Sequence, residues 1–260
     1  MNRSESSSEF LSILNIAFYR FVDVPSLFTE FPGGFPELRE AMIKACKARH
    51  LKGKILLSDE GINGCLAGTV PEIRTIQTYF EQFSIFSGME YKESYSEFRP
   101  FKRMLVKLKK EIIPVGDSEV RPAQISGPRI APKELKQWLD ENRDFSFLDT
   151  RNKYEIGYGT FEKASHLGIK NFRQFEDELK KLPEEVKKRP MVMFCTGGIR
   201  CEKASLIALR NGINDVYQLD GGILRYFEEV GGTHYQGKCF VFDDRVALDS
   251  ELKPEVDLPS

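Results

Sequence analysis

Short apolar runs alternate with amphipathic segments in the first 113 residues. Residues 12–24 are apolar and aromatic and are followed by Pro25, which predicts a strand that ends there. From Pro36 onward, apolar residues recur at three-and-four spacing, the pattern of an amphipathic helix. The same reading predicts a second helix and four more strands, at 71–83 and at 54–57, 62–67, 89–95 and 103–113.

This order is β-α-β-β-α-β with one additional strand. It matches a ferredoxin-like (acylphosphatase-like) α+β domain, in which two helices cover a sheet, and we assign it to residues 10–113. In the last strand, Met104, Val106 and Leu108 share one face, so we expect that face to be buried.

Residues 114–131 are rich in Pro, Gly and Ser and lack periodicity, which indicates a linker. Strands and helices then alternate, a pattern typical of an α/β domain with a central parallel sheet. We assign this domain to 132–232 and a C-terminal extension to 233–260. The predicted helices are 132–139, 172–182, 201–211 and 222–230, and the predicted strands are 145–149, 191–194 and 216–219.

Composition narrows the class of protein. The chain has 260 residues, 30% of them charged, a net charge of −1, and five scattered cysteines, which do not form a disulfide framework. Residues 1–9 are polar, without the apolar core of an export signal, and no run has the length of a membrane span. We therefore expect a cytoplasmic protein without a membrane partner. The net charge does not decide whether the chain binds nucleic acid.

The strand 191–194 runs directly into a cysteine loop. Cys195 is followed by Thr196, Gly197, Gly198, Ile199 and Arg200, and then by a predicted helix. Two glycines let the backbone turn tightly enough for successive N–H groups to point at the sulfur, and the helix N-terminus faces the same point. Arg200 adds a positive charge. The loop therefore favours the thiolate, the nucleophilic form of cysteine, and Cys195 is the candidate catalytic residue.

Three further residues are candidates for supporting this loop. Cys201 is either a second thiol that resolves an oxidised Cys195 or a small packing residue, and a resolving thiol has to be both close and exposed. Asp149 and Arg151 follow a strand that ends at the same edge of the sheet. They are either an ion pair that holds the loop or a purely structural ion pair, and we favour the structural interpretation.

A basic stretch near the end of the first domain suggests nucleic acid. It contains no acidic residue and includes Arg99, Lys102, Arg103, Lys107, Lys109 and Lys110, with Phe98 and Phe101 beside it. Cations with an aromatic neighbour suit contacts with phosphates and bases, although a solvated surface explains the same composition. The histidines are isolated, and no residues have the spacing of metal ligands.

Residues 130–229 resemble a rhodanese domain. The resemblance lies in the stretch 147–151 with Tyr154 and Glu155, in the cysteine loop, and in the stretch 216–222. It implies a six-residue loop whose cysteine carries persulfide sulfur. Many rhodaneses have Gly-His-Ile where this chain has Gly159-Thr160-Phe161, so no histidine is transferred from that motif.

Over nearly its whole length, the chain resembles the bacterial tRNA uridine hydroxylase family. Cys-Thr-Gly-Gly-Ile-Arg-Cys-Glu-Lys-Ala at 195–204 is similar to the signature of that family, and the stretches 58–64, 106–112 and 239–246 agree with it. The resemblance implies that the protein is an oxidoreductase that converts the wobble uridine of tRNA to 5-hydroxyuridine. It further implies molecular oxygen as co-substrate, tRNA as partner, and a need for the loop cysteine. No cofactor motif and no protein partner are evident.

Two alternatives stay open at this stage. A sulfurtransferase that passes persulfide sulfur from Cys195 to an acceptor fits the same loop, and so does a persulfide sensor without catalysis. The stretch 58–64 is either a plain turn between strands or a segment whose Asp59, Glu60 and Asn63 face the target base.

Overall fold

The computed structural model describes residues 13–117 and 119–254. The polar stretch 1–9, used above as a sign that no export signal is present, lies outside the described residues. The elements, in chain order, are β1 (Ile13–Phe21), η1 (Val24–Thr29), α1 (Gly34–Lys47), β2 (Lys52–Ser58), β3 (Gly61–Thr69), α2 (Val70–Glu81), β4 (Tyr91–Ser96), β5 (Met104–Leu108), β6 (Arg129–Ile130), α3 (Pro132–Asp140), β7 (Ser146–Asp149), α4 (Lys153–Ile156), β8 (Gly159–Phe161), β9 (Ser165–His166), η2 (Phe172–Gln174), α5 (Phe175–Lys180), α6 (Glu184–Lys187), β10 (Met191–Phe194), α7 (Ile199–Arg210), β11 (Val216–Leu219), α8 (Gly222–Val230), β12 (Tyr235–Gly237), β13 (Cys239–Phe240) and β14 (Ala247–Leu248).

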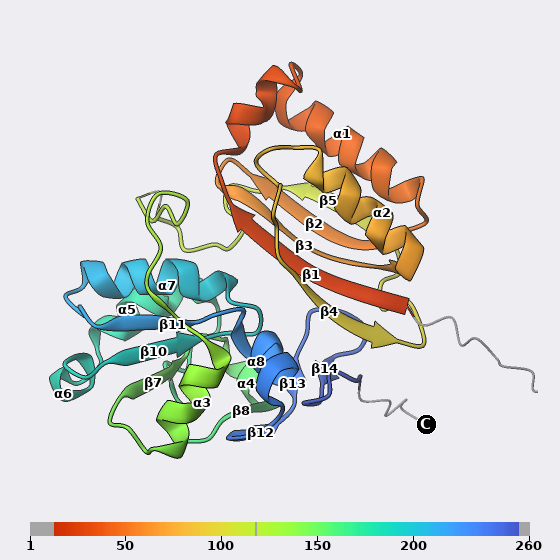
Figure 1. The fold of residues 1–260 in the computed structure, drawn as a ribbon. Coiled ribbons are helices and arrows are strands. Elements are labelled where there is room, and N and C mark those ends of the chain that lie inside the picture. Colours follow the sequence, from red (N-terminus) through yellow and green to blue (C-terminus); the bar gives the residue numbers. More distant parts are fainter. Residues whose placement is uncertain (1–12, 118, 255–260) are drawn as a thin grey trace, which may run out of the picture.

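The first domain is a five-stranded sheet with the order β4-β1-β3-β2-β5. β1 pairs antiparallel with β3 and β4, β2 pairs antiparallel with β3, and the additional strand β5 joins β2 in parallel. α1 and α2 cover one face, and the second domain lies on the other side of the sheet (Figure 1). Leu14, Ile16 and Phe18 alternate along β1 and belong to the core with these helices. The predicted ferredoxin-like order is confirmed.

The second domain holds a parallel sheet with the order β6-β11-β10-β7-β9. All four residues of β10, all four of β7 and three of the four in β11 are buried, as expected for strands covered on both faces. β10 is the middle strand, so the cysteine loop that follows it lies at the centre of the carboxyl edge. Open parallel sheets bind their ligands at this edge. The predicted parallel sheet is confirmed.

Several predicted elements differ in extent. The strand predicted at 103–113 ends at Leu108, because its partner β2 ends at Ser58 and the chain then turns away. Leu108 is 42% exposed, against the prediction of a buried face, since β5 is an edge strand. The helix predicted at 172–182 is two shorter segments, η2 and α5.

The sequence reading missed six short strands, namely β6, β8, β9, β12, β13 and β14. Each has two or three residues, too few to show a hydrophobic period. One of them, β6, lies inside the stretch 114–131, where we expected no regular element, and it pairs with β11.

Candidate active site

The loop after β10 encloses the sulfur of Cys195. The side chain is fully buried, and the backbone N–H of Gly198 donates to Sγ at 3.1 Å. Gly198 has φ = +97° and is the N-cap of α7, a backbone conformation that glycine adopts without strain. The sulfur therefore lies at the start of a 12-residue helix, where N–H groups and the helix dipole favour an anion.

The first turn of α8 closes the loop from the other side. The N–H of Ile223 donates to the carbonyl of Cys195 at 2.9 Å, and that of Leu224 donates to Thr196 at 3.0 Å. Gly222 has φ = +67°, and a Cβ there would lie 2.5 Å from the Cys195 oxygen. Only glycine fits at this position. Two helices thus hold the loop rigidly.

The thiols of Cys195 and Cys201 are both buried, yet their pKa values move in opposite directions. Burial raises the pKa of Cys195, but the hydrogen bond from Cys201, the charge of Arg200 and the N–H groups of Arg200 and Gly198 outweigh it and lower the pKa from 9.0 to about 6. Burial and the neighbouring Cys195 sulfur raise the pKa of Cys201 well above its usual value. Cys195 is therefore thiolate at neutral pH, while Cys201 stays a thiol that donates to it.

The position of Cys201 bears on its two interpretations. It is close to Cys195 and contacts the hydroxyl of Thr150, with Oγ1 3.8 Å from Sγ. It is also fully buried, and the described cysteines form no disulfide. The structure thus meets the requirement of nearness for a resolving thiol but not that of exposure.

Arg200 is held by a buried carboxylate. Its Nη1 and Nη2 donate to Oε1 and Oε2 of Glu155 at 2.6 and 2.7 Å, and both side chains are buried. Arg200 therefore acts on the Cys195 sulfur through its charge and its backbone N–H, while Glu155 fixes its orientation. Glu155 belongs to the stretch that resembles rhodaneses, although the sequence did not show its pairing.

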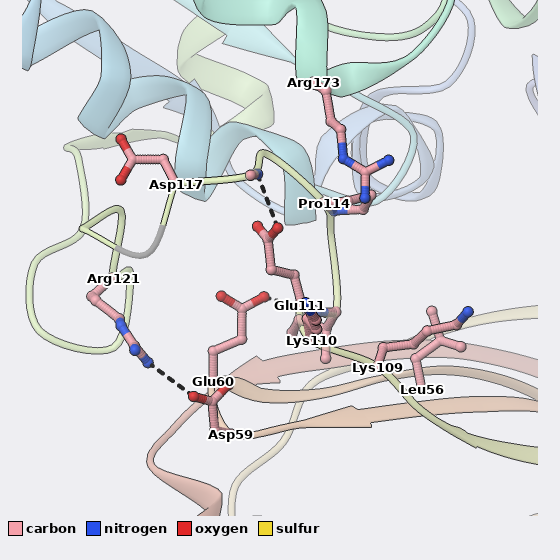
Figure 2. Close-up of a pocket in the computed structure, with 12 residues that line it drawn as sticks. Leu56, Asp59, Glu60, Lys109, Lys110, Glu111, Pro114, Asp117, Arg121 and Arg173 are labelled. Atoms are coloured by element: carbon pink, nitrogen blue, oxygen red, sulfur yellow. Dashed lines mark hydrogen bonds and ion pairs between the residues drawn. The ribbon is translucent and has the colours of Figure 1, made fainter.

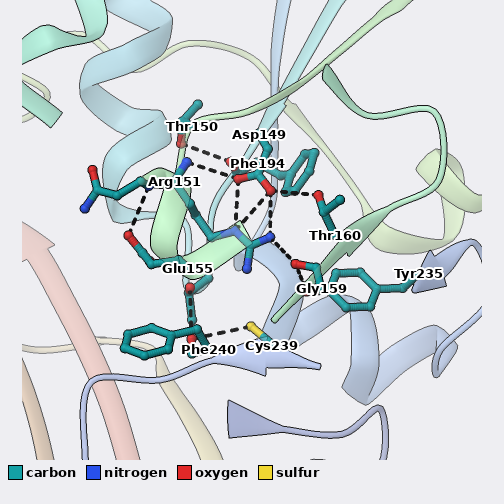
Figure 3. Close-up of polar contacts among 12 residues, drawn as sticks. Asp149, Thr150, Arg151, Glu155, Gly159, Thr160, Phe194, Tyr235, Cys239 and Phe240 are labelled. Carbon is teal, nitrogen blue, oxygen red and sulfur yellow. Dashed lines mark hydrogen bonds and ion pairs between the residues drawn. The ribbon is translucent and has the colours of Figure 1, made fainter. Parts of the chain in front are cut away.

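Asp149 and Arg151 form the expected ion pair behind the loop. Arg151 Nε and Nη2 donate to the two carboxylate oxygens of Asp149, at 2.9 and 2.6 Å, and both side chains are fully buried (Figure 3). Arg151 Nη2 also donates to the carbonyl of Gly159, and the hydroxyl of Thr160 donates to Asp149 at 2.7 Å. Thr160 occupies the position where the sequence departs from the rhodanese motif, and here it completes the ion-pair network.

The first domain reaches the loop through Tyr19 of β1. Its hydroxyl donates to Glu202 of α7 at 3.1 Å, and its Oη lies 3.0 Å from the point where a Cβ on Gly198 would stand. One side of the cysteine loop therefore lies against the sheet of the first domain. This contact could not be predicted from the sequence, because residues 19 and 198 are far apart along the chain.

A buried charge cluster joins the two domains beside α7. The ammonium of Lys203, which has no exposed surface, lies 2.8 Å from a carboxylate oxygen of Glu60 and 2.8 Å from one of Glu111. Glu60 lies in the turn between β2 and β3, and its Oε1 also accepts the N–H of Ile112 at 2.7 Å. Glu60 is thus occupied in the domain junction. Asn63 donates to the carbonyl of Ile112, so its amide is occupied there as well.

A cavity of about 790 Å³ opens next to this cluster (Figure 2). Glu60 and Glu111 line it, and four cations, Lys109, Lys110, Arg121 and Arg173, lie around it. Two of the predicted tRNA contacts therefore lie at a hollow between the domains.

The other predicted tRNA contacts are distributed along one edge of the first domain. Lys102, Arg103 and Lys107 are exposed at and before β5, the edge strand. Arg99 is half-buried and paired with Glu72 at 2.8 Å, so part of its charge is already used within the protein.

Comparison with known proteins places the chain in a family. Residues 13–112 match the UPF0176 acylphosphatase like domain, and residues 131–229 match the rhodanese-like domain. A protein of Cupriavidus metallidurans called tRNA uridine(34) hydroxylase is 45% identical over 249 residues, which cover 94% of this chain and 86% of that protein. The chain belongs to the tRNA uridine(34) hydroxylase family.

Other members of the tRNA uridine(34) hydroxylase family match over similar lengths. One from Cupriavidus taiwanensis is 46% identical and covers 94% of this chain and 86% of that protein. One from Bordetella petrii is 42% identical and covers 94% and 95%. The resemblance stated from the sequence is thereby confirmed.

Three of the four stretches that carried this resemblance meet at the domain junction. Lys203 comes from the stretch 195–204, Glu60 from 58–64 and Glu111 from 106–112. In the fourth stretch, 239–246, Arg245 pairs with Asp243 at 2.6 Å and donates to Ser94 of β4 at 2.7 Å. All four stretches therefore take part in contacts between the domains.

The structure shows no group of three or more His, Cys, Asp or Glu side chains able to hold a metal in residues 13–117 and 119–254. Nor does any helix in these residues have the length and apolar character needed to cross a bilayer.

Proposed function

We propose that this protein hydroxylates the uridine at position 34 of tRNA to 5-hydroxyuridine, with Cys195 as its nucleophile. The observation that carries this proposal is a buried thiolate, held at the N-terminus of α7 and facing the sheet of the first domain, in a chain that belongs to a tRNA uridine(34) hydroxylase family. A thiolate at neutral pH is a strong nucleophile, and covalent attack divides a difficult step into easier ones.

In the proposed reaction, the Cys195 thiolate adds to C6 of the uracil ring. The C5–C6 double bond breaks as the S–C6 bond forms, and its electron pair is shared between C5 and the O4 carbonyl. C5 then attacks molecular oxygen, and protonation of the outer oxygen gives a hydroperoxide on C5. Two electrons and two protons from an external reductant break the O–O bond, so that a hydroxyl group remains on C5 and the outer oxygen leaves as water. Loss of the C5 proton then restores the C5–C6 double bond as the S–C6 bond breaks and the thiolate departs.

The protein's own residues have defined parts in this scheme. Arg200, fixed by Glu155, and the N–H of Gly198 hold the negative charge on sulfur before attack and after departure. The network around Asp149 and Arg151 keeps β7, and with it the neighbouring loop, in place. The proton on Cys201 stays with that thiol and stabilises the Cys195 thiolate.

We assign tRNA binding to the basic edge of the first domain. Lys102, Arg103 and Lys107 are exposed there, and Lys109 and Lys110 lie at the cavity between the domains. Cations at this edge are suited to the phosphates of an RNA strand that runs toward the loop. We place the reaction in the cytoplasm, where a free thiolate stays reduced.

The experiment is nucleoside mass spectrometry of tRNA from cells that lack the gene and carry either the wild-type gene or a variant. Wild type restores 5-hydroxyuridine and nucleosides derived from it, whereas Cys195→Ala leaves the level at that of the deletion. Cys46→Ala, a buried cysteine of α1 in the other domain, is the matched control and retains activity. Full modification by Cys195→Ala would contradict the role of the sulfur.

A sulfurtransferase activity is the second candidate, because the low pKa of Cys195 and the rhodanese-like domain also suit a persulfide. Formation of thiocyanate from thiosulfate and cyanide measures it. Rapid turnover, together with unchanged 5-hydroxyuridine and altered thiolated nucleosides in the deletion strain, would favour this second function.

A further inference from the structure

Lys92 is a buried cation on the side of the first sheet that faces the cysteine loop. It lies on β4 opposite the small residue Ala17 of β1, and only 8% of it is exposed. Its Nζ is 4.9 Å from the centre of the Tyr19 ring, the ring whose hydroxyl reaches α7. The residues described by the structure offer Nζ no ion pair and no hydrogen bond.

The carboxylates around Lys92 are already paired with arginines. Glu90 lies 2.6 Å from Arg225, and Asp220 lies 2.5 Å from Arg225 and 2.8 Å from Arg129. Glu202 is 2.5 Å from Arg129 as well. A buried charge without an ion pair or a hydrogen bond is costly, so this arrangement leaves Lys92 suited to a negative group that comes from outside the protein.

The space beside Lys92 connects it with the loop. Lys92 and Thr196 line one cavity of about 60 Å³ between the domains. Lys92, Tyr19 and Glu202 line a second, more open cavity of about 260 Å³. Lys92 therefore lines both hollows, and the smaller one reaches the cysteine loop at Thr196.

Electrostatics agrees with this placement. Burial lowers the pKa of Lys92, and the negative charges of Glu90, Asp220 and Cys195 partly oppose that effect, whereas Arg225 adds to it. The thiolate of Cys195 is thus near enough to act on the ammonium, and the ammonium acts equally on the thiolate.

We propose that Lys92 belongs to the Cys195 site and binds a negatively charged oxygen of the nucleotide that enters between the domains. This inference rests on the proposed function. The oxygen has two possible sources in the substrate, O4 of the uracil ring as it gains charge or a phosphate next to the target nucleoside. Both are anionic oxygens, and Lys92 offers either of them an ammonium in a site largely screened from water.

Steady-state kinetics on tRNA compare Lys92→Met, Lys92→Arg and wild type, with Lys133→Met as control. Lys133 is an exposed lysine of α3. We expect Lys92→Met to lower kcat/KM roughly 10- to 100-fold, the usual effect of losing a hydrogen bond to a charged group. A fall in kcat identifies uracil O4 as the partner. A rise in KM identifies the phosphate as the partner. In that case the slope of log affinity against log salt should also fall by about 1, the change expected for one lost phosphate contact.

A second readout does not depend on turnover. Without the charge of Lys92, alkylation of Cys195 by iodoacetamide should require a higher pH than in wild type or in Lys133→Met. Lys92→Arg keeps the charge and should keep both the alkylation profile and part of kcat/KM. Lys92→Met should be about as stable as wild type, because it removes a buried charge that only the Tyr19 ring offsets.

Three results would overturn the inference. One is wild-type kinetics and alkylation in Lys92→Met, and another is an arginine variant no better than the methionine variant. A loss of stability in Lys92→Met well beyond the small contribution of its contact with the Tyr19 ring would also overturn it, since Lys92 would then have an ionic or hydrogen-bond partner within the protein. If wild type itself forms no 5-hydroxyuridine, the proposed function fails instead, and the alkylation profiles still report whether Lys92 acts on Cys195.

Discussion

The cysteine loop and the Lys203 cluster bury charge at neighbouring points of α7, but they hold it by different means. Cys195 is an anion held by N–H groups, a thiol and one arginine whose own carboxylate partner lies behind it. Lys203 is a cation saturated by two carboxylates that both come from the first domain or its end. The first arrangement leaves the sulfur free to form a new bond. The second has no free capacity and serves to join the domains.

This contrast predicts that the junction carries more stability than any exposed ion pair. Lys203→Met leaves the buried Glu60 and the partly buried Glu111 without their cation, so we expect the free energy of unfolding to fall by about 3–5 kcal/mol. Chemical denaturation measures it. Lys136→Met breaks an exposed pair with Asp140 and should cost less than about 1 kcal/mol.

A double variant separates lost pairing from lost packing. In Lys203→Met with Glu60→Gln, one of the two buried charges is removed, and part of the lost stability should return. Equal destabilisation by Lys203→Met and Lys136→Met would show that the cluster is no stronger than a surface pair, and the contrast with the loop would disappear.

In the cysteine loop, the pKa of Cys195 should respond to the loss of a charge rather than to a change in packing. Arg200→Met removes the positive charge that lowers the pKa of Cys195, so we expect the midpoint for alkylation to rise by roughly 1–3 pH units from about 6. Iodoacetamide labelling across pH 5–9 with peptide mass mapping measures it. The pKa values of Cys46, Cys65 and Cys239 are raised to about 12, so these thiols stay unreactive in this range.

Arg200→Met also leaves Glu155 unpaired, and its negative charge would itself raise the pKa of Cys195. The variant Arg200→Met with Glu155→Gln removes this effect and should have an alkylation midpoint between those of wild type and the single variant. An unchanged midpoint in both variants would mean that the N–H groups and the Cys201 thiol stabilise the thiolate without the charge of Arg200.

The difference between the loop and the junction also shows which features of the structure could be predicted from the sequence. The loop is six consecutive residues, so a strand, two glycines and an arginine already indicated a bound anion at Cys195. The ion pair of Asp149 and Arg151 could be predicted for the same reason, because the two residues are only two positions apart in the sequence. The order of the main helices and strands along the chain followed from helical and strand periodicity, and the comparisons confirm the fold class and the family.

The junction could not be read in this way. Its three charged residues are more than 40 positions apart, and Glu60 has the sequence context of an ordinary turn. Lys92 and Tyr19 were missed for the same reason, since their relation to the loop exists only once the sheets are packed together. Short strands such as β6 were missed because two residues have no period. The individual roles of the basic residues stay predictions.

The charge on Cys195 should make part of the stability depend on pH. Its pKa is lowered from 9.0 to about 6, so the unfolded chain binds the proton more tightly than the native protein between these values. The contribution is complete above about pH 9 and is lost as the pH falls through about 6. The stability difference between wild type and Cys195→Ala should therefore grow by up to about 1.4 kcal/mol per pH unit from pH 6 to 9.

Urea unfolding at several pH values measures this dependence. Cys239→Ala is the matched control, because the pKa of that buried thiol is raised and its native form stays protonated over this range. Between pH 6 and 8, the free energy of unfolding of Cys239→Ala should change with pH in the same way as that of wild type. A parallel curve for Cys195→Ala as well would mean that the sulfur is not ionised in the native protein.

The smallest predicted effect is on tRNA affinity. It concerns the exposed lysines of the first domain, whose charges face solvent and are not buried like those of the loop and the junction. Lys109 and Lys110 lie at the cavity beside the junction, and nothing buries their ammonium groups. If both contact phosphates, Lys109→Ala with Lys110→Ala should reduce the slope of log affinity against log salt by up to about 2. Filter binding of tRNA between low and moderate salt measures it. Lys180→Ala with Lys181→Ala, at the C-terminal end of α5 in the other domain, changes the net charge equally and should leave the slope unchanged. Equal slopes in the two double variants would show that tRNA responds only to net charge, and the basic edge would then have no special part in binding.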